Sequence, residues 1–433
     1  MRRLRLPERP GWEEQILADG LVYSPTPTPD GGRISYWREG AAYELTPAEV
    51  ATLEAATAAL FEMCVGAGDW LAERPDVLTA MGIPDWAHEQ VVGTWHDEPA
   101  WQSVYGRFDL RFGGLDHPDP ALRVPTLYEF NADTPTCLVE SAYAQWRWRE
   151  QVRPSADQWN QLYERLVEAW RRNLGLAEKR LGHRPLVHFT CSSTESSGED
   201  VMNTQFLRDT CAAAGYDTKT AFMEGVLLGA DGRFYDGDGV HLDVAFKLYP
   251  WEFMVAEEFG RAAFADMATI GRRDGFRQYR GGTVWIEAPY KMMWSNKGLL
   301  AVLWARYGDD PGRARHLIPA WFADPPAGLP GPPADLAAYV RKPLLGREGA
   351  SIEIVRPGAA PETVPGEYGA EGYVVQSWAP PPTVPTGAAY GEVVHPVLGA
   401  WLVDGEPAGL GIRESAGPIT DNLSHFVPHV IGE

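Results

Sequence analysis

The sequence has few cysteines and few basic residues, and both shortages limit what the protein can be. Its four cysteines, Cys64, Cys137, Cys191 and Cys211, are scattered along 433 residues without a CxxC pair. A structural zinc site or a disulfide framework is therefore not expected. Lys and Arg number 38 against 59 Asp and Glu, which gives a formal net charge of −21. This balance disfavours nucleic-acid binding, although a local group of basic residues can still bind a small anion.

Long apolar runs are also missing. No stretch approaches the ~18 apolar residues that would span a bilayer, and the first residues, MRRLRLPERPGWEEQ, lack the apolar core of a secretory signal. We therefore expect a cytoplasmic protein with reduced thiols. Since 45% of the residues are hydrophobic, the chain can build two or three domains or one multi-lobed unit.

Helical patterns occur in the first half of the chain. A Thr-Pro pair opens an apolar-periodic run that predicts a helix over residues 46–66. Two more helices are predicted over 141–152 and 155–176, the second capped by Ser155 or Asp157.

Strand-like patterns alternate with these helices, so the fold class is mixed α and β. Short β-rich runs at 185–191, 240–249 and 282–290 predict strands. The Pro- and Gly-rich stretch 309–335 predicts a connector or an exposed loop.

The stretch LYEFNADTPTC places three oxygen-bearing side chains within five residues. In an extended chain Glu129, Asn131 and Asp133 would share one face and converge. Such a trio could bind a hard cation, or it could be a solvated strand face. Asp133, followed by Pro135, could instead cap a turn and helix that begin near Thr136.

The stretch YVRKPLLGREGASIEIV, residues 339–355, predicts a hairpin with GREG at its tip. Gly346 and Gly349 allow the loop backbone to approach a ligand closely, and Lys342 on the first arm could meet a phosphate. Because most Gly-containing hairpins are plain turns, this loop alone is weak support for a phosphate site.

For two further stretches, too, both an anion-binding role and a purely structural role are possible interpretations. Ser295 and Asn296 precede an apolar helical run with Lys297 near its first turn, where free N–H groups could receive an anion. Taken alone, this pattern favours an ordinary capped helix with a solvated lysine. Arg413 lies on a strand-like run near Asp421, where an arginine is most often a surface or ion-pair residue.

These stretches resemble, in the same order, the signature segments of the glutathionylspermidine synthase family. The matching segments are GRFDLRF, YEFNADTPTCLVES, MMWSNKGLLAVLW, VRKPLLGREGASIEIV, YVVQSW and GLGIRESAGPITDNLSHFVPH. The resemblance implies an α/β synthetase fold of the ATP-grasp type, with a pre-ATP-grasp substrate region and a Gly-loop lid. We expect substrate and metal ligands within residues 1–290 and the nucleotide-binding region within 291–433, as approximate parts of one interwoven unit.

The resemblance also implies an activity and the residues that carry it. The activity is ATP- and Mg²⁺-dependent joining of a carboxylate to an amine through an acyl phosphate. The implied Mg²⁺ ligands are Asp109, Glu129 and Asn131. The implied nucleotide contacts are Lys297, Lys342, Gly346, Arg347, Gly349, Gln376 and Arg413. Charge on the transferring phosphate would be stabilised by Arg107 and Arg413. The implied substrate contacts are Thr134, Thr136, Glu199 and Asp200.

Other expectations limit this assignment. Cys137 is interpreted as a small buried residue rather than a nucleophile. Bifunctional members carry an N-terminal cysteine amidase domain, and we expect none here. The partners implied are a small or peptide-like carboxylate and an amine, without nucleic acid or membrane.

Two alternatives to a ligase remain. One is a nucleotide-binding pseudo-enzyme or scaffold of the same fold. The other is a metal-dependent hydrolase that uses only Asp109, Glu129 and Asn131, which leaves the GREG loop and the two lysines unexplained.

Overall fold

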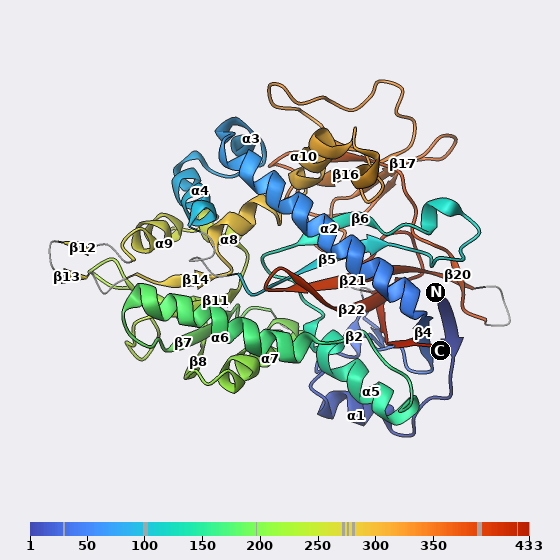
Figure 1. Cartoon of the computed structure of the whole chain (residues 1–433), viewed down its shortest axis with the longest axis horizontal. Coiled ribbons are helices and arrows are strands. Elements are labelled where there is room, and N and C mark those ends of the chain that lie inside the picture. The colour runs from blue at the N-terminus through green and yellow to red at the C-terminus, as the bar shows by residue number, and fades with distance from the viewer. Residues whose placement is uncertain are drawn as a thin grey trace.

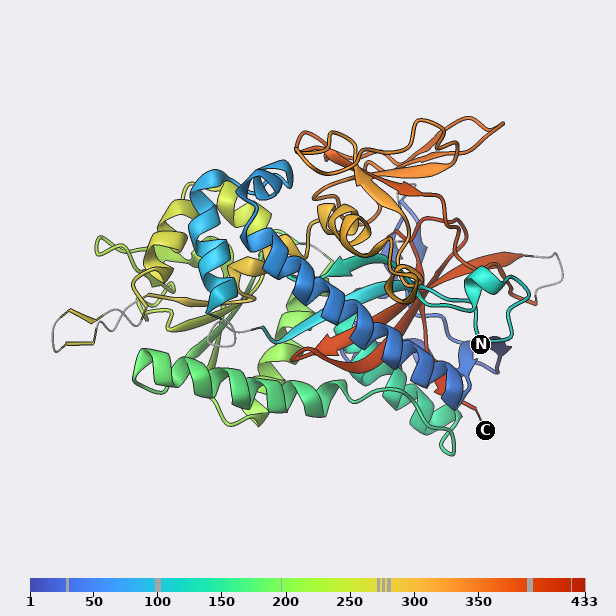
Figure 2. The ribbon, with the colours of Figure 1, turned by 45° about the horizontal axis from the view of Figure 1, so that its top comes forward.

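Three main β-sheets with helices packed around them form the architecture (Figure 1). The computed structural model describes residues 1–28, 31–97, 103–195, 197–270, 273–274, 277–278, 282–387, 392–421 and 423–432. In Figure 2 the sheet that contains β16 lies above the central red and cyan strands, and the green parallel sheet lies to their left. The fold class is therefore mixed α/β, as the sequence predicts.

The central sheet takes its strands from both ends of the chain. Its order is β23-β22-β21-β5-β6, with β20 paired to β21, and all these pairings are antiparallel. The strands are β5 (Tyr105–Arg111), β6 (Thr126–Asn131), β20 (Val384–Pro385), β21 (Val393–Val403), β22 (Glu406–Ser415) and β23 (His425–Val427). Because β5 pairs with β21, this sheet joins both sides of residue 290. A domain division at that residue stays a prediction.

The second sheet is parallel and has the order β14-β11-β7-β8. Its strands are β7 (Val187–Cys191), β8 (Thr218–Phe222), β11 (Val244–Leu248) and β14 (Val284–Ile286). Three of them confirm the strands predicted within 185–191, 240–249 and 282–290. The sequences VHFTC, VAFKL and VWI are buried at every position, as strands inside a parallel sheet usually are.

The third sheet is antiparallel and confirms the hairpin predicted at 339–355. Its order is β15-β19-β16-β17-β18. The strands are β15 (Ala320–Phe322), β16 (Tyr339–Pro343), β17 (Glu353–Val355), β18 (Glu362–Thr363) and β19 (Tyr373–Ser377). Helix α10 (Gly298–Tyr307) packs on β15 and β19. The stretch 309–335 is not only a connector, because its apolar segment AWF forms the buried edge strand β15 and α11 (Pro311–Ala314) precedes it.

Helix α2 (Pro47–Ala72) crosses the molecule in Figure 1 and begins where the sequence predicts. Thr46 Oγ1 accepts a hydrogen bond from the Glu49 N–H (3.2 Å), and Glu49 Oε2 accepts one from the Thr46 N–H (2.9 Å). This reciprocal pair is a capping box. The helix continues past Gly66, which is a close-packing position rather than a stop: a Cβ there would lie 2.4 Å from the Tyr307 hydroxyl.

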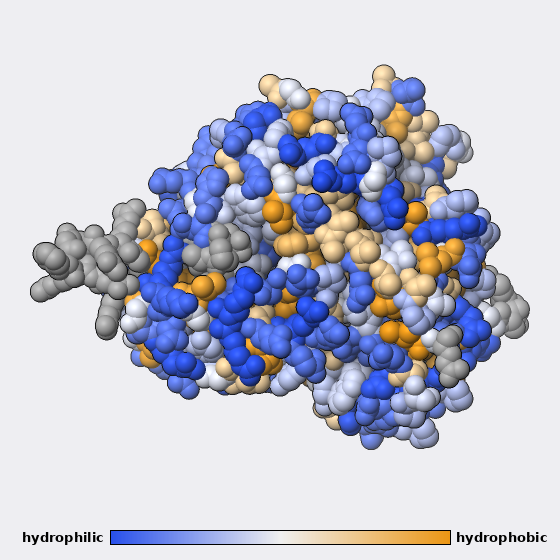
Figure 3. Space-filling view, in the orientation of Figure 1, coloured by the Kyte–Doolittle hydropathy of each residue, from blue (hydrophilic) through white to orange (hydrophobic). Residues whose placement is uncertain are grey.

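The composition of α2 corrects the expectation about long apolar runs. Among the described residues, α2 is the one helix long and apolar enough to cross a membrane by composition alone. It contacts α10 and the strands β21 and β22, and Leu53, Leu60 and Leu71 are fully buried. Its apolar residues are thus part of the core. On the face of the molecule that α2 crosses, hydrophilic residues (blue) and hydrophobic residues (pale to full orange) are interspersed (Figure 3).

The two helices after residue 140 differ from expectation at their starts. A π-helical turn, η3 (Glu140–Ala144), leads into α5 (Gln145–Val152), within the predicted helix. Helix α6 (Leu162–Leu181) starts later than Ser155 or Asp157, and neither residue caps it. Asp157 and Asn160 instead make β-bridges to Ile431 and Gly409. Tertiary pairing holds these residues extended, so the second helix start was predicted wrongly.

The remaining elements complete the shell around the sheets. The two termini meet in a three-stranded sheet of order β1-β4-β24 (Figure 1). Its strands are β1 (Arg2–Arg5), β4 (Ala41–Leu45) and β24 (His429–Ile431). The other helices are α1 (Trp12–Ala18), α3 (Pro75–Ala80), α4 (His88–His96), α7 (Glu199–Ala213), α8 (Trp251–Ala256) and α9 (Gly260–Met267). Short strands are β2 (Thr26–Pro27), β3 (Arg33–Ile34), β9 (Leu227–Leu228), β10 (Phe234–Tyr235), β12 (Arg273–Asp274) and β13 (Arg277–Gln278).

The contact at Gly66 gives a test of the packing of α2 on α10. We expect Gly66→Ala to destabilise the protein by about 1–3 kcal/mol through overpacking against Tyr307, despite the better helix propensity of alanine. In a Tyr307→Phe background, which removes the hydroxyl, the same substitution should cost much less. Thermal or urea unfolding of the single and double variants measures this coupling. Equal costs in both backgrounds would contradict the close contact.

Candidate active site

Two adjoining cavities lie beside the central sheet and share part of their lining. The smaller, of about 110 Å³, lies against the third sheet, and the larger, of about 920 Å³, extends toward the parallel sheet. Every sequence-predicted site residue lines at least one of them. Those that line both are Asp109, Glu129, Lys297, Gly346 and Gly349. Those that line the smaller alone are Lys342 and Gln376. Those that line the larger alone are Arg107, Asn131, Thr134, Thr136, Glu199, Asp200, Arg347 and Arg413.

Strand register places four of these side chains together. In the β5–β6 ladder Asp109 lies opposite Glu129, and Arg107 lies opposite Asn131. Residues two apart on a strand share a face, so the four polar groups form one array on the sheet. Asn131 Nδ2 donates to Glu129 Oε1 at 3.4 Å. The convergence predicted for Glu129 and Asn131 is thus confirmed.

Asp109 is bound by two arginines from different strands. Arg107 Nε lies 2.7 Å from its Oδ1, and Arg413 Nη2, from β22, lies 2.9 Å from its Oδ2. Between them on β21 is Gly399, where a Cβ would lie 2.9 Å from Arg107 Cδ. The missing side chain therefore leaves room for Arg107 above the middle strand. Only 4% of Asp109 and 6% of Arg107 are exposed, so each charge needs its partners.

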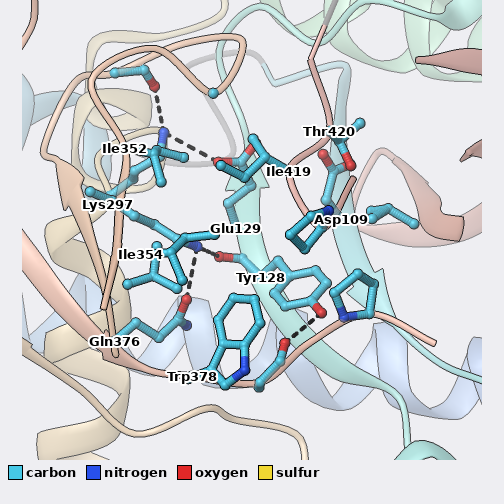
Figure 4. Close-up of a pocket in the computed structure, with 18 of the residues that line it drawn as sticks. Asp109, Tyr128, Glu129, Lys297, Ile352, Ile354, Gln376, Trp378, Ile419 and Thr420 are labelled. Carbon is cyan, nitrogen blue, oxygen red and sulfur yellow. Dashed lines mark hydrogen bonds and ion pairs between the residues drawn. The ribbon is translucent and has the colours of Figure 1, made fainter. Parts of the chain in front are cut away.

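Glu129 is held by lysines (Figure 4). Lys297 Nζ lies 3.2 Å from Glu129 Oε2. Burial would raise the pKa of Glu129, but the ammonium groups of Lys297 and Lys342 outweigh it and lower the pKa to about 2. Burial lowers the pKa of Lys342 to about 8 against the attraction of Glu129. At neutral pH the Glu129 carboxylate is therefore ionised and the Lys342 ammonium remains mostly charged.

Gln376 lies beside Trp378 in the smaller cavity (Figure 4), and Lys342 lines the same cavity. Lys342 Nζ donates to Gln376 Oε1 at 2.8 Å and to the Tyr128 carbonyl at 3.3 Å. Gln376 Nε2 is buried and has no hydrogen-bond partner among the described residues. Apolar side chains of Ile354 and Trp378 complete this part of the wall. The cavity thus offers one unused donor beside apolar surfaces.

The loop that joins β16 to β17 covers the junction of the two cavities. Gly349 has a φ of 73°, and a Cβ there would lie 2.8 Å from Ile419, so glycine is required at this position. Lys297 Nζ donates to the Gly346 carbonyl. Arg347 points into the larger cavity, where it pairs with Glu252 (2.8 Å) and donates to Thr134 Oγ1 (3.0 Å).

Asp133 does not join Glu129 and Asn131, which corrects part of the expectation. Its carboxylate accepts hydrogen bonds from Lys247 Nζ (2.7 Å) and from the Trp251 N–H at the start of α8 (2.9 Å). The capping of its own turn near Thr136 is wrong as well. The physical reason is that β6 ends at Asn131, so the alternation of side chains stops before Asp133.

The far wall of the larger cavity is acidic. Its carboxylates are Glu195, Glu199, Asp200, Glu224, Glu252 and Glu348. Burial, and after it the neighbouring Glu199, raises the pKa of Asp200 to about 7. Burial also raises the pKa of Glu199. The basic residues Arg107, Lys297 and Arg413 line the same cavity, so its walls carry both signs of charge.

Sequence reasoning missed several lining residues. Glu252 is the second residue of α8, which begins shortly after the end of β11, and polar residues beyond the carboxyl ends of parallel strands are a usable signal for a site. Tyr128 precedes Glu129 in β6, Trp378 directly follows the end of β19, and both line the smaller cavity. Nothing in the sequence distinguished them. Cys137 is buried, and burial raises the pKa of its thiol to about 11, which agrees with an unreactive residue.

Comparisons with known proteins give the family. Residues 3–432 match the family model described as "Glutathionylspermidine synthase preATP-grasp". A Haemophilus influenzae protein named as an acid–amine ligase is 32% identical over 438 residues, covering 98% of this chain and 97% of its own. Trypanothione synthetase of Crithidia fasciculata is 23% identical, covering 79% of this chain and 49% of its own. The bifunctional glutathionylspermidine synthetase/amidase of Escherichia coli is 24% identical, covering 72% and 48%.

The chain thus spans about half the length of the last two relatives. Among solved structures, an apo glutathione synthetase-like effector of Globodera pallida superposes with a TM-score of 0.55 at 10% identity, covering 99% of this chain and 100% of its own. This likeness supports the ATP-grasp-type synthetase fold. The family match covers nearly the whole sequence, and the chain belongs to the glutathionylspermidine synthase family.

Proposed function

We propose that the protein is an ATP- and Mg²⁺-dependent ligase that joins a carboxylate to an amine through an acyl phosphate. One observation carries the proposal. Asp109 and Glu129 meet four basic side chains, Arg107, Lys297, Lys342 and Arg413, where the two cavities join. Phosphoryl transfer needs this combination of metal-binding carboxylates and phosphate-binding cations. The names of the relatives support the same reaction class.

The smaller cavity suits the base of the nucleotide. Its apolar walls would pack on the two faces of a flat ring, and the unused Nε2 of Gln376 would donate a hydrogen bond to the ring edge. Lys342, beside Gln376, would bind the phosphates where the cavities join. The loop from Gly346 to Gly349 would cover them.

The residues present fit a magnesium ion. Asp109, Glu129 and Asn131 bring oxygen donors from two paired strands to one face of the sheet, and Mg²⁺ prefers oxygen ligands with several waters or phosphate oxygens. When bound, Mg²⁺ would neutralise part of the phosphate charge. Arg107 and Arg413, which hold Asp109 in the structure, would then be in reach of the transferring phosphate.

The larger cavity has room for both acceptor substrates. A carboxylate oxygen would attack the γ-phosphorus of ATP while ADP leaves, which gives an acyl phosphate. The amine nitrogen would then attack the acyl carbon while phosphate leaves, and the nitrogen would lose a proton. The basic residues at the junction would attract the carboxylate, and the acidic far wall would attract a cationic amine.

A nucleotide-binding pseudo-enzyme stays the alternative. Both acids, both lysines and both arginines are present and in contact, which favours a working ligase. Hydrolysis by the three metal ligands alone would leave Gln376 and Lys342 without a role.

Turnover gives the first test of the function. With ATP, Mg²⁺ and a pool of amino acids, small peptides and polyamines, we expect ADP release that requires both a carboxylate and an amine. Mass spectrometry should find a product that weighs the sum of the two less one water. Nucleotide binding without turnover in such pools would indicate a pseudo-enzyme instead.

Glu129→Gln tests the metal ligands. The variant keeps the size of the side chain but removes its charge, so we expect a higher Mg²⁺ requirement and a rate lower by about 10²-fold. Glu224→Gln, on the acidic wall of the larger cavity, removes the same charge away from the junction and is the matched control for the Mg²⁺ requirement, which it should leave unchanged even if it weakens binding of the amine. The assay is the rate of ADP release as a function of Mg²⁺ concentration. Wild-type Mg²⁺ dependence in Glu129→Gln would rule out this ligand.

Lys342→Met tests the phosphate contact. Removing the charge while keeping most of the side-chain volume should raise the KM for ATP by about 10-fold or more, which corresponds to ~1.4 kcal/mol. Arg341→Met is the control, because Arg341 lies next along β16 and stacks on Tyr373 at 3.6 Å outside both cavities. Steady-state kinetics at varied ATP measure both. If the two variants had the same KM, Lys342 would have no special role.

A further inference from the structure

A cluster of ligand-type side chains lies on the inner wall of the larger cavity, apart from the residues assigned to Mg²⁺. Cys137 Sγ and one carboxylate oxygen each of Glu140 and Glu199 all lie within 4.8 Å of one another. Glu140 is the first residue of η3, Cys137 lies three residues before it, and Glu199 is the first residue of α7. Two elements distant in sequence thus bring three donors to one point.

Glu140 is the member that calls for an explanation. It is 0% exposed, and neither Oε1 nor Oε2 has a hydrogen-bond partner among the described residues. A buried carboxylate without partners is costly and rare in folded proteins. Burial, and then the nearby Glu199, raises its pKa to about 8. Both oxygens are therefore available to a ligand that the protein residues do not supply.

From this geometry we propose a second metal site, formed by Cys137, Glu140 and Glu199, for a divalent cation with affinity for thiolate such as Zn²⁺. One sulfur and two carboxylate oxygens match the ligands that zinc accepts, and the fourth position stays open to the cavity. A tetrahedral zinc ion with bonds of about 2.0–2.3 Å holds its ligand atoms about 3.3–3.8 Å apart, so the three donors, which lie within 4.8 Å of one another without the ion, would draw together on binding. Mg²⁺ prefers oxygen ligands alone, so the two sites differ in chemistry.

The surroundings suit this ion. The hydroxyl of Tyr36 lies 3.2 Å from Cys137 Sγ and would orient the sulfur, as residues behind metal ligands often do. Burial raises the pKa of the thiol, and the nearby Arg413 and Arg107 oppose this and favour the thiolate. The three ionised ligands and Asp109 carry four negative charges against two on the arginines. A divalent cation neutralises the difference.

The position of the site beside the larger cavity determines how a metal ion reaches it and how the bound ion affects ligation. Cys137 and Glu199 line it, so an ion reaches the site from solvent. On binding, the Cys137 thiol and the Glu140 carboxyl release their protons to water, and the sulfur and the carboxylate oxygen bond to the metal. An occupied site removes Glu199 from the wall that would receive the amine, so Zn²⁺ should inhibit ligation. The metal site itself does not depend on the proposed function.

Cobalt binding to the full-length protein, without ATP or substrates, tests the site. Co²⁺ bound by a thiolate gives an intense sulfur-to-metal charge-transfer band, which an oxygen-only site does not give. We expect one equivalent of Co²⁺ to produce this band and one equivalent of Zn²⁺ to remove it. Cys137→Ser should abolish the band, and Glu140→Gln should weaken binding by about 10-fold or more.

Cys211→Ser is the matched control, because Cys211 is buried on the same helix as Glu199 and should not change the band. Glu199→Gln, which lines the cavity, replaces Glu140→Gln if that buried variant does not fold, and it should weaken binding as much. Thermal melts without metal report folding. Absence of the band in the wild type, or its survival in Cys137→Ser, would overturn the proposal.

Discussion

The pairing of Asp109 with Arg107 and Arg413 is the interaction on which the site depends. Asp109 and Arg107 are buried in the central sheet and Arg413 is half-buried, and a buried charge without a partner is strongly destabilising. Their contact requires β5 and β22 to flank β21 in the observed register. Gly399, on the middle strand β21, then lies between Asp109 of β5 and Gly411 of β22. The same register places Glu129 beside Asp109. Forming the central sheet therefore also assembles the candidate site.

The balance of charge at this point explains how an acidic protein can bind an anion. The whole chain carries −21, yet the array formed by Asp109, Glu129 and the four basic side chains has an excess of two positive charges. Without a ligand, Arg107 and Arg413 share Asp109, and Lys297 pairs with Glu129, so three of the four cations have a carboxylate partner. An incoming polyphosphate and its cation can exchange with those pairs, so the desolvation of each charge is already offset in the free protein.

Features that depend on a local residue pattern could be predicted from the sequence, whereas features that depend on contacts between distant segments could not. Alternation along a strand placed Glu129 and Asn131 together, and the glycines of GREG indicated the hairpin. Alternation failed for Asp133, because the strand ends before it and Lys247, from another sheet, binds its carboxylate. The late start of α6 has the same origin, since Asn160 is held by Gly409. Glu140 could not be identified because its burial without partners is a property of the folded cavity alone.

The loop between β16 and β17 links the two cavities mechanically. Lys297 binds both Glu129 and the Gly346 carbonyl, so a ligand that draws Lys297 away also frees the loop backbone. On the other side Arg347 ties the loop to Glu252 and to Thr134, three residues beyond Asn131. A change at Glu129 is thus transmitted to the loop through side chains in direct contact. In the proposed function, nucleotide and acceptor substrates would share this loop as one wall, and their binding would be interdependent.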